Sequence, residues 1–186
     1  MLRLFTLLSL LQILSCGPPE ISDSATKHDH ILKLHVGTYT GHGSEGIYQL
    51  DFDMTTGALS NKSLLVSTSN PSFITYSGQQ NMLYAVNEGK EGTVSAFRWN
   101  HTRDSLLLVS QRSSEGSAPC HLELNPEGTL LAVANYGTGN MVIYRVDEQG
   151  DLLEDPQVFQ HAGSGPVQPN QSGPRAHCVK FHPNGR

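Results

Sequence analysis

The sequence lacks clusters of Lys and Arg, and it lacks several motifs that mark familiar enzyme classes. Its formal net charge is −5 and no basic cluster interrupts it, so we expect no nucleic-acid partner. It contains neither a Gly-x-Ser-x-Gly nucleophile elbow nor a Walker loop. None of its nine histidines is spaced like a zinc ligand, so we expect no metal. Hydrophobic residues make up 37% and charged residues 16%, which excludes a disordered chain and a membrane bundle.

An apolar run opens the chain. Residues 4–14 are almost wholly apolar, which is too short to span a bilayer comfortably and is typical of a signal-peptide core. We expect residues 1–16 to form a signal peptide of the lipoprotein type, in which Cys16 is acylated; the alternative is a simple secretory signal cut nearby. Residues 17–31 are polar and are expected to be a tether. The protein is then exported, either periplasmic or held at a membrane by its lipid anchor alone.

An internal repeat organises the rest of the chain, with a period suited to either a four-stranded propeller blade or a helical repeat. Leu83 recurs as Leu131, and Asn87 recurs as Asn135 at the same spacing, with no gap needed between them. The next step forward is longer, because Pro126 recurs as Pro183. The extra residues of this longer step fit an enlarged Gly/Pro-rich loop over 163–173.

Short apolar runs decide between these two architectures. No unit has helical apolar spacing over a stretch long enough for a stable helix. We therefore predict an all-β chain: a β-propeller of four-stranded antiparallel blades, about three of them, over residues 32–186. A propeller closes with four to eight blades, so we expect either a fragment or a short product that assembles with copies of itself. The oligomeric state is left open. The runs expected to be strands include 73–76, 82–87, 93–99 and 141–146.

A series of short motifs in fixed order resembles one family of propellers, the seven-bladed lactonases. The family includes 6-phosphogluconolactonases and a fungal muconate-lactonizing enzyme. The resemblance implies seven blades in a complete member. It also implies opening or closing of a lactone ring without metal or organic cofactor. The motifs that carry it lie at residues 35–40, 46–48, 70–72, 83–88, 92–97, 118–122 and 133–137.

A further segment supplies the candidate catalytic residues. Residues 173–177 resemble the family's Pro-His-Ala-His segment, which contributes a functional histidine. His177 matches that histidine, and the resemblance implies a role as general acid and base. Arg175 replaces the segment's first histidine; it either binds an anionic substrate group or is a solvated loop arginine. The family's other active-site glutamate and arginines belong to later blades, which this sequence does not contain.

The repeat adds three candidate substrate contacts. Glu88 stands where the next unit has Tyr136, and this break in the repeat indicates either a substrate contact or a charged turn residue. We include Tyr136 as a candidate contact. His121 begins an inner strand and either faces substrate or makes a structural hydrogen bond. Cys120 and Cys178 are expected to be buried free thiols, although their places in neighbouring repeats also allow a disulfide.

The resemblance and these residues together predict a lactone hydrolase. The expected enzyme is similar to 6-phosphogluconolactonase and opens a small sugar lactone to the aldonic acid. Export favours an unphosphorylated aldonolactone, because phosphorylated sugars are intracellular. Two alternatives stay open: an exported propeller that binds a glycan or protein without turnover, and a lactone-forming cycloisomerase.

Overall fold

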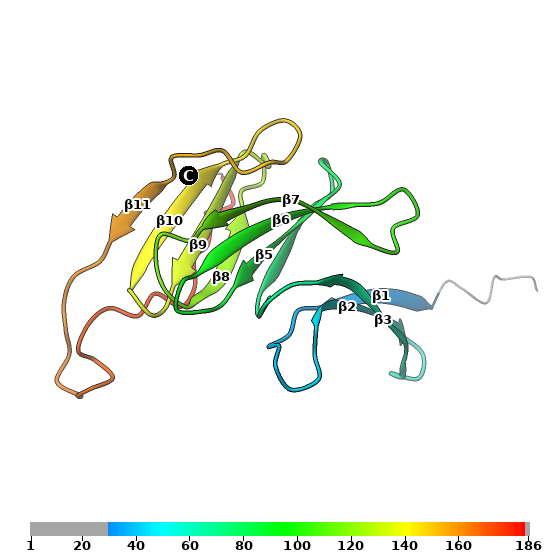
Figure 1. Ribbon diagram of the computed structural model, residues 1–186, viewed down its shortest axis with the longest axis horizontal. Helices are drawn as coiled ribbons and strands as arrows, with labels where there is room; N and C mark the ends of the chain where they lie inside the picture. The colour runs from blue at the N-terminus through cyan, green and yellow to red at the C-terminus, as the bar shows by residue number, and fades with distance from the viewer. Residues whose placement is uncertain (1–29, 185–186) are drawn as a thin grey trace, which may run out of the picture. The chain divides into compact units, whose positions relative to one another are not determined.

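The computed structural model describes residues 30–184, which form eleven strands in three antiparallel sheets (Figure 1). The predicted all-β fold is confirmed. The predicted runs 82–87 and 93–99 coincide with strands, and the other two differ from strands by one residue. The strands are β1 (Ile31–Val36), β2 (Gly46–Asp53), β3 (Leu59–Ser67), β4 (Ile74–Ser77), β5 (Met82–Asn87), β6 (Thr93–Trp99), β7 (Leu106–Ser113), β8 (Pro119–Leu124), β9 (Leu130–Asn135), β10 (Asn140–Arg145) and β11 (Gln157–Gln160).

Two of the three sheets have the predicted four strands. Their orders are β4-β5-β6-β7 and β11-β10-β9-β8, so each blade is a simple meander. The first sheet has only three strands among the described residues, in the order β1-β2-β3. The repeat explains the difference. Asn87 at the end of β5 has its counterpart one repeat earlier in Tyr39, just after β1. β1 therefore corresponds to β5 and β9, and the first sheet lacks the counterpart of β4 and β8.

Strand β5 divides the core into two clusters. Every residue of β5 is buried, because neighbouring sheets cover both of its faces. Successive side chains point to opposite faces of a strand. Tyr84 and Val86 accordingly pack toward the third sheet, in a cluster that includes Leu131 and Val142. Leu83 and Ala85 pack toward the first sheet, in a second cluster whose other members include Ile47, Leu65, Phe97 and Trp99.

A turn of the third sheet is held by polar side chains of the second. The buried Tyr84 hydroxyl donates to the carbonyl of Gly150 at 2.9 Å, and Gln80 Nε2 donates to the carbonyl of Asp147 at 2.8 Å. Gly150 has φ +88°, and a Cβ there would lie 2.4 Å from Met82 Cγ. Only glycine satisfies both the left-handed backbone and the close approach. This turn therefore fixes the two blades against each other.

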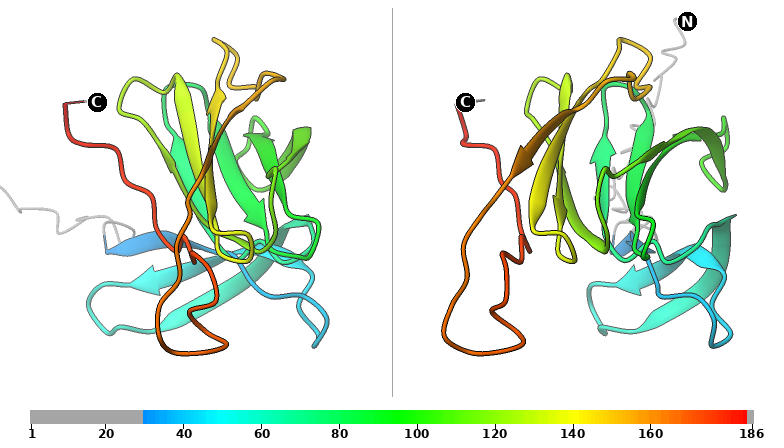
Figure 2. Two further views of the ribbon diagram at one scale, coloured as in Figure 1. Left: turned by 90° about the vertical axis from the view of Figure 1, so that its left-hand side faces the viewer. Right: turned by 60° about the vertical axis from the view of Figure 1, so that its left-hand side comes forward.

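The chain beyond β11 runs away from its sheet and returns beside β8 (Figure 2). Glu123 of β8 pairs with Lys180 and also accepts a hydrogen bond from the backbone N–H of Phe181. Residues 173–184 follow β8 without forming a strand, and a turn is present at residues 183–184. The predicted signal peptide, including Cys16, and the tether up to residue 29 lie outside the described residues. No helix within residues 30–184 is long and apolar enough to cross a membrane.

Candidate functional site

One cavity of about 260 Å³ collects side chains from all three blades. It lies where β4 and β8 begin and where β5 and β9 end. Three of the predicted site residues line it, and three further residues join them that sequence reasoning missed. The lining residues are Tyr39, Ser72, Glu88, Cys120, Tyr136 and His177.

The repeat accounts for this gathering. Ser72 and Cys120 are one repeat apart, and the longer step that follows separates Cys120 from His177. These three residues therefore hold the same position in successive blades. Glu88 and Tyr136, directly after β5 and β9, are likewise one repeat apart. Equivalent residues of a repeat protein lie side by side on one surface, so five lining residues come from two repeat positions.

A left-handed turn before each inner strand holds Glu88 and Tyr136 in place. Asn70 and Ala118, which are counterparts in the repeat, have φ of 41° and 48°. The Asn70 carbonyl accepts from the N–H of Glu88, and the Ala118 carbonyl accepts from the N–H of Tyr136, both at 2.9 Å. A non-glycine residue in this region carries backbone strain. The same strained geometry is thus kept in two blades, at residues that bond to the backbone of Glu88 and Tyr136 in the cavity lining.

Glu88 is anchored through its side chain as well. Its Oε2 accepts hydrogen bonds from the Tyr39 hydroxyl at 2.7 Å and the Ser72 hydroxyl at 2.6 Å. The side-chain amide of Asn70 donates to the Glu88 carbonyl at 3.0 Å. The hydrogen bond to Glu88 raises the pKa of Tyr39, so the phenol stays protonated and keeps donating at neutral pH.

His177 lies exposed at the rim of the cavity, against Tyr136. The two rings meet edge to face, with centroids 5.5 Å apart. The Arg175 guanidinium lies 5.5 Å from the centroid of the same Tyr136 ring, and its Nη1 donates to the carbonyl of Gly137 at 2.7 Å. Arg175 is not among the lining residues. It provides a positive charge beside the cavity, next to the side that His177 occupies.

Both described cysteines are free, as expected, but neither is buried. Cys120 is the extra residue of a bulge in β8, which turns its thiol toward the cavity and away from the core. The partial burial of Cys120 raises the pKa of its thiol, so it stays protonated and is a poor nucleophile. Cys178 is exposed, and its Sγ lies 3.7 Å from His121 Nε2.

His121 is not brought into the cavity. Its ring stacks on Phe73, with centroids 4.3 Å apart, and its Nδ1 accepts from the N–H of Val179 at 3.4 Å. Cys178 Sγ lies 3.7 Å from its Nε2. Phe73 and Cys178 are the repeat counterparts of His121 in the preceding and following blades. The geometry thus gives His121 a packing role between blades.

This packing predicts that the stability of the protein depends on pH. Burial lowers the pKa of His121; Lys180 and His177 lower it further and Glu123 opposes them. His121 therefore binds a proton more readily in the unfolded chain than in the folded protein. Stability is lost as pH falls through the ordinary histidine range. We expect His121→Phe, which copies Phe73, to reduce the fall in melting temperature between pH 7.5 and pH 5. An unchanged fall would show that other groups cause it.

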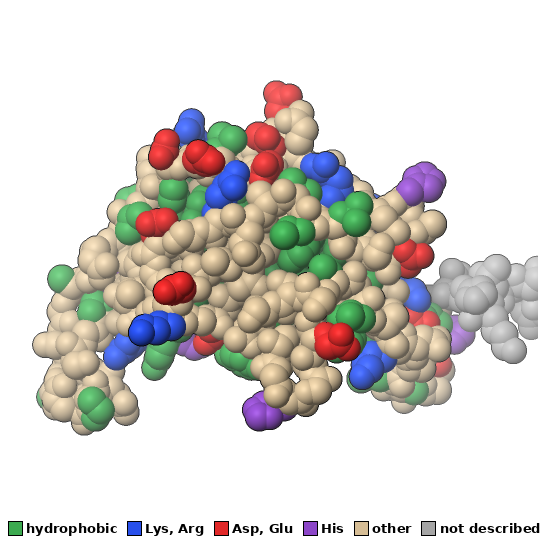
Figure 3. All heavy atoms as spheres, in the orientation of Figure 1, with side chains coloured by type: hydrophobic (Ala, Val, Ile, Leu, Met, Phe, Trp, Pro, Cys, Tyr) green, Lys and Arg blue, Asp and Glu red, His purple; other side chains and the backbone are tan. Residues whose placement is uncertain are grey.

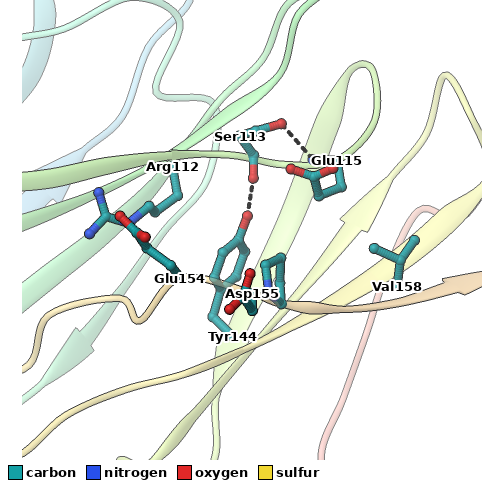
Figure 4. A pocket seen from close by; sticks show the side chains of 8 residues that line it. Arg112, Ser113, Glu115, Tyr144, Glu154, Asp155 and Val158 are labelled. Carbon is teal, nitrogen blue, oxygen red and sulfur yellow. Dashed lines mark hydrogen bonds between the residues drawn. The ribbon is translucent and has the colours of Figure 1, made fainter.

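A larger cavity, of about 480 Å³, lies at the outer strands (Figure 4). Its polar groups are partly used within the protein: Tyr144 donates to the Ser113 carbonyl, and Arg112 Nε donates to the Leu152 carbonyl at 3.1 Å. It contains no predicted site residue.

Figure 3 shows acidic and basic side chains interspersed on the face of the protein that is drawn. Within residues 30–184, no group of three His, Cys, Asp or Glu side chains is placed to hold a metal.

The chain is built of antiparallel blades that repeat in sequence, and a polar cavity lies where their inner strands begin. These features define a β-propeller with a candidate site at one end of its blades. The chain belongs to the lactonase family of seven-bladed propellers. The family model described as "Lactonase, 7-bladed beta-propeller" matches residues 33–186. The predicted family and fold are thereby confirmed.

The chain spans less than half the length of the family members that it matches. The 6-phosphogluconolactonase of Bacillus subtilis (strain 168) is 30% identical over 150 residues, which cover 80% of this chain and 43% of that protein. The 6-phosphogluconolactonase of Formosa agariphila is 30% identical over 152 residues, which cover 80% of this chain and 43% of that protein. The solved structure of the periplasmic gluconolactonase of Pseudomonas aeruginosa is 31% identical, with a TM-score of 0.76, covering 83% of this chain and 45% of that one.

Proposed function

We propose that the protein is a lactone hydrolase, similar to 6-phosphogluconolactonase, that opens a sugar lactone to the aldonic acid. The observation that carries the proposal is the cavity itself, which brings His177 together with Glu88 and Tyr136. Membership of the lactonase family and the names of its relatives support it. A small-molecule lactone is the ligand class that this homology suggests.

Hydrolysis of a lactone by this cavity would use His177 to carry a proton and Arg175 to supply a positive charge. A water molecule attacks the ring carbonyl while a nitrogen of His177 takes its proton. The carbon–oxygen bond that forms leaves a tetrahedral oxyanion, which the positive charge of Arg175 favours. When the ring carbon–oxygen bond breaks, His177 returns the proton to the departing ring oxygen. The ring oxygen becomes a hydroxyl, and the carboxylic acid that forms ionises to the carboxylate by releasing the second proton of the water to solvent.

Export of the protein would favour one class of lactone as its substrate. The apolar run over residues 4–14 supports a signal peptide, and Cys16 supports a lipid anchor. An exported enzyme meets unphosphorylated aldonolactones, and the relative from Pseudomonas aeruginosa is itself described as a periplasmic gluconolactonase. We therefore propose the unphosphorylated lactone as substrate.

Hydrolysis of two lactones tests both parts of this proposal. We expect the protein to convert glucono-1,5-lactone to gluconate faster than the spontaneous reaction, and to favour it over the 6-phosphorylated lactone. Proton NMR of the product distinguishes ring opening from cyclisation. Rates equal to the spontaneous reaction for both lactones would contradict the enzymatic function. Activity equal on both lactones, or confined to the phosphorylated one, would contradict the substrate.

A further inference from the structure

Glu88 is a half-buried carboxylate that pairs with no cation among residues 30–184. The ion pairs in this part of the chain join Lys33 to Asp51 and Lys180 to Glu123. Both groups that hold the Glu88 side chain are neutral hydroxyls. An ionised carboxylate has about four acceptor positions, and the two hydroxyls fill only two of them. Glu88 can therefore accept further hydrogen bonds from a ligand.

The anchoring of Glu88 fixes which oxygen meets the ligand. Both donated bonds go to Oε2, from Tyr39 after β1 and from Ser72 at the start of β4. Turning the carboxylate would break both bonds, and the bond from Tyr39 joins the first blade to the second. Oε1 is left as the oxygen with open acceptor positions. This arrangement is preorganised, because the ordering of the side chain is already complete before a ligand arrives.

The residues around Glu88 indicate which kind of ligand group donates hydrogen bonds to it. An anionic group, such as a phosphate, is repelled by the Glu88 charge, whereas the Arg175 cation beside Tyr136 is a more favourable place for one. Tyr39 and Tyr136 add aromatic surface to the lining, which suits the apolar C–H face of a sugar ring. Neutral hydroxyls on a ring meet all of these conditions.

We propose that Glu88 is the specificity-determining residue of this cavity, accepting hydrogen bonds from adjacent hydroxyls of a polyhydroxylated ring. Tyr39 and Ser72 are positioning residues that hold its carboxylate in place. The inference rests on the proposed function, because the sugar lactone supplies the hydroxyls. It deepens that function by naming the part of the substrate that Glu88 reads and by placing any anionic group away from it.

A stable substrate counterpart tests this without turnover. Glucono-1,5-lactam keeps the ring and hydroxyls of the lactone, and 2-piperidone keeps the ring alone. The quantity to measure by NMR titration is the preference of the protein for the first over the second. Hydrogen bonds to a charged group contribute about 1.5–3 kcal/mol, so we expect Glu88→Gln to reduce this preference about tenfold or more. An unchanged preference would overturn the proposal.

Three further measurements separate specificity from folding. The glutamine amide oxygen still accepts from Tyr39 and Ser72, so the melting temperature of Glu88→Gln should stay close to that of the wild type. Glu91→Gln removes an exposed charge outside the cavity and should leave the preference unchanged. Tyr39→Phe should weaken lactam binding less than Glu88→Gln, because one of the two anchors remains. An equal loss of binding for both ring compounds in Glu88→Gln would indicate a structural role instead.

Failure of this inference is distinguishable from failure of the proposed function. If lactam binds through Glu88 but no lactone is hydrolysed, the function is wrong and the inference stands. If lactone is hydrolysed and Glu88→Gln changes neither KM nor lactam preference, the function stands and the inference is wrong. In the expected case, Glu88→Gln raises KM for gluconolactone with a smaller change in kcat.

Discussion

His177→Ala is expected to lower kcat for lactone hydrolysis by about a hundredfold or more. General acid–base catalysis by a positioned side chain contributes on the order of 10²–10⁴ to rate, and alanine removes the proton carrier altogether. His177 lies exposed against Tyr136 at the cavity rim, so its removal leaves the core intact. Steady-state kinetics with gluconolactone measure the effect.

His101→Ala is the matched control for this variant. His101 is also exposed, but it comes after the last residue of β6. The first residue of β6, Thr93, pairs with Asn87 beside the cavity, so His101 lies at the other end of the strand. We expect its kinetics to equal those of the wild type. If His177→Ala kept full kcat while the protein remained folded, His177 would have no part in the chemistry.

Tyr84→Ala is expected to lower the free energy of unfolding by about 3–5 kcal/mol, the range found for removing a large buried aromatic side chain. Tyr84 is fully buried between the second and third blades, and its hydroxyl bonds to Gly150 across them. Alanine would leave a cavity in the cluster of Val133 and Val142 and would free the Gly150 carbonyl. Urea unfolding measures the loss.

Tyr84→Phe separates the two contributions. It keeps the ring and removes only the hydroxyl, so we expect a loss of about 1–2 kcal/mol, mainly from the Gly150 carbonyl left without its donor. If Tyr84→Ala cost no more than Tyr84→Phe, ring packing would not stabilise the junction between these blades. The hydrogen bond would then be the main contribution of Tyr84.

Much of the fold follows from the repeat, because strands at the centre of a blade are apolar on both faces. The runs around Leu83 and Leu131 carry that pattern, and they became β5 and β9. The three-stranded first sheet could also be predicted from the repeat, by aligning Tyr39 with Asn87. Strand ends were less predictable, since hydrogen bonds across the sheet set them and leave little trace in composition.

The site was predictable where a residue broke the repeat and less so elsewhere. Glu88 was recognisable because it differs from its counterpart Tyr136. Ser72 and Cys120 were missed, although they are the counterparts of His177 in the two preceding units. The direction of a side chain near a bulge could not be predicted from sequence, because a bulge interrupts the alternation of faces without altering the apolar pattern.

The remaining missed residue, Tyr39, shows a different limit. Its repeat counterparts are the buried Asn87 and Asn135, which predict a turn role and not a cavity residue. The segment after β1 is irregular, however, and its path carries the Tyr39 hydroxyl to Glu88. Such a contact between loops of different blades depends on tertiary structure and has no local signal.

We expect the cavity of Glu88 and His177 to be the site where the lactone binds. A crystal structure of the protein with glucono-1,5-lactam tests it most directly. We predict the ring in this cavity, with hydroxyls on Glu88 Oε1 and the carbonyl carbon within one water molecule of His177. A lactam ring bound elsewhere, for example in the cavity of about 490 Å³ lined by His35, Tyr76 and Trp99, would contradict it.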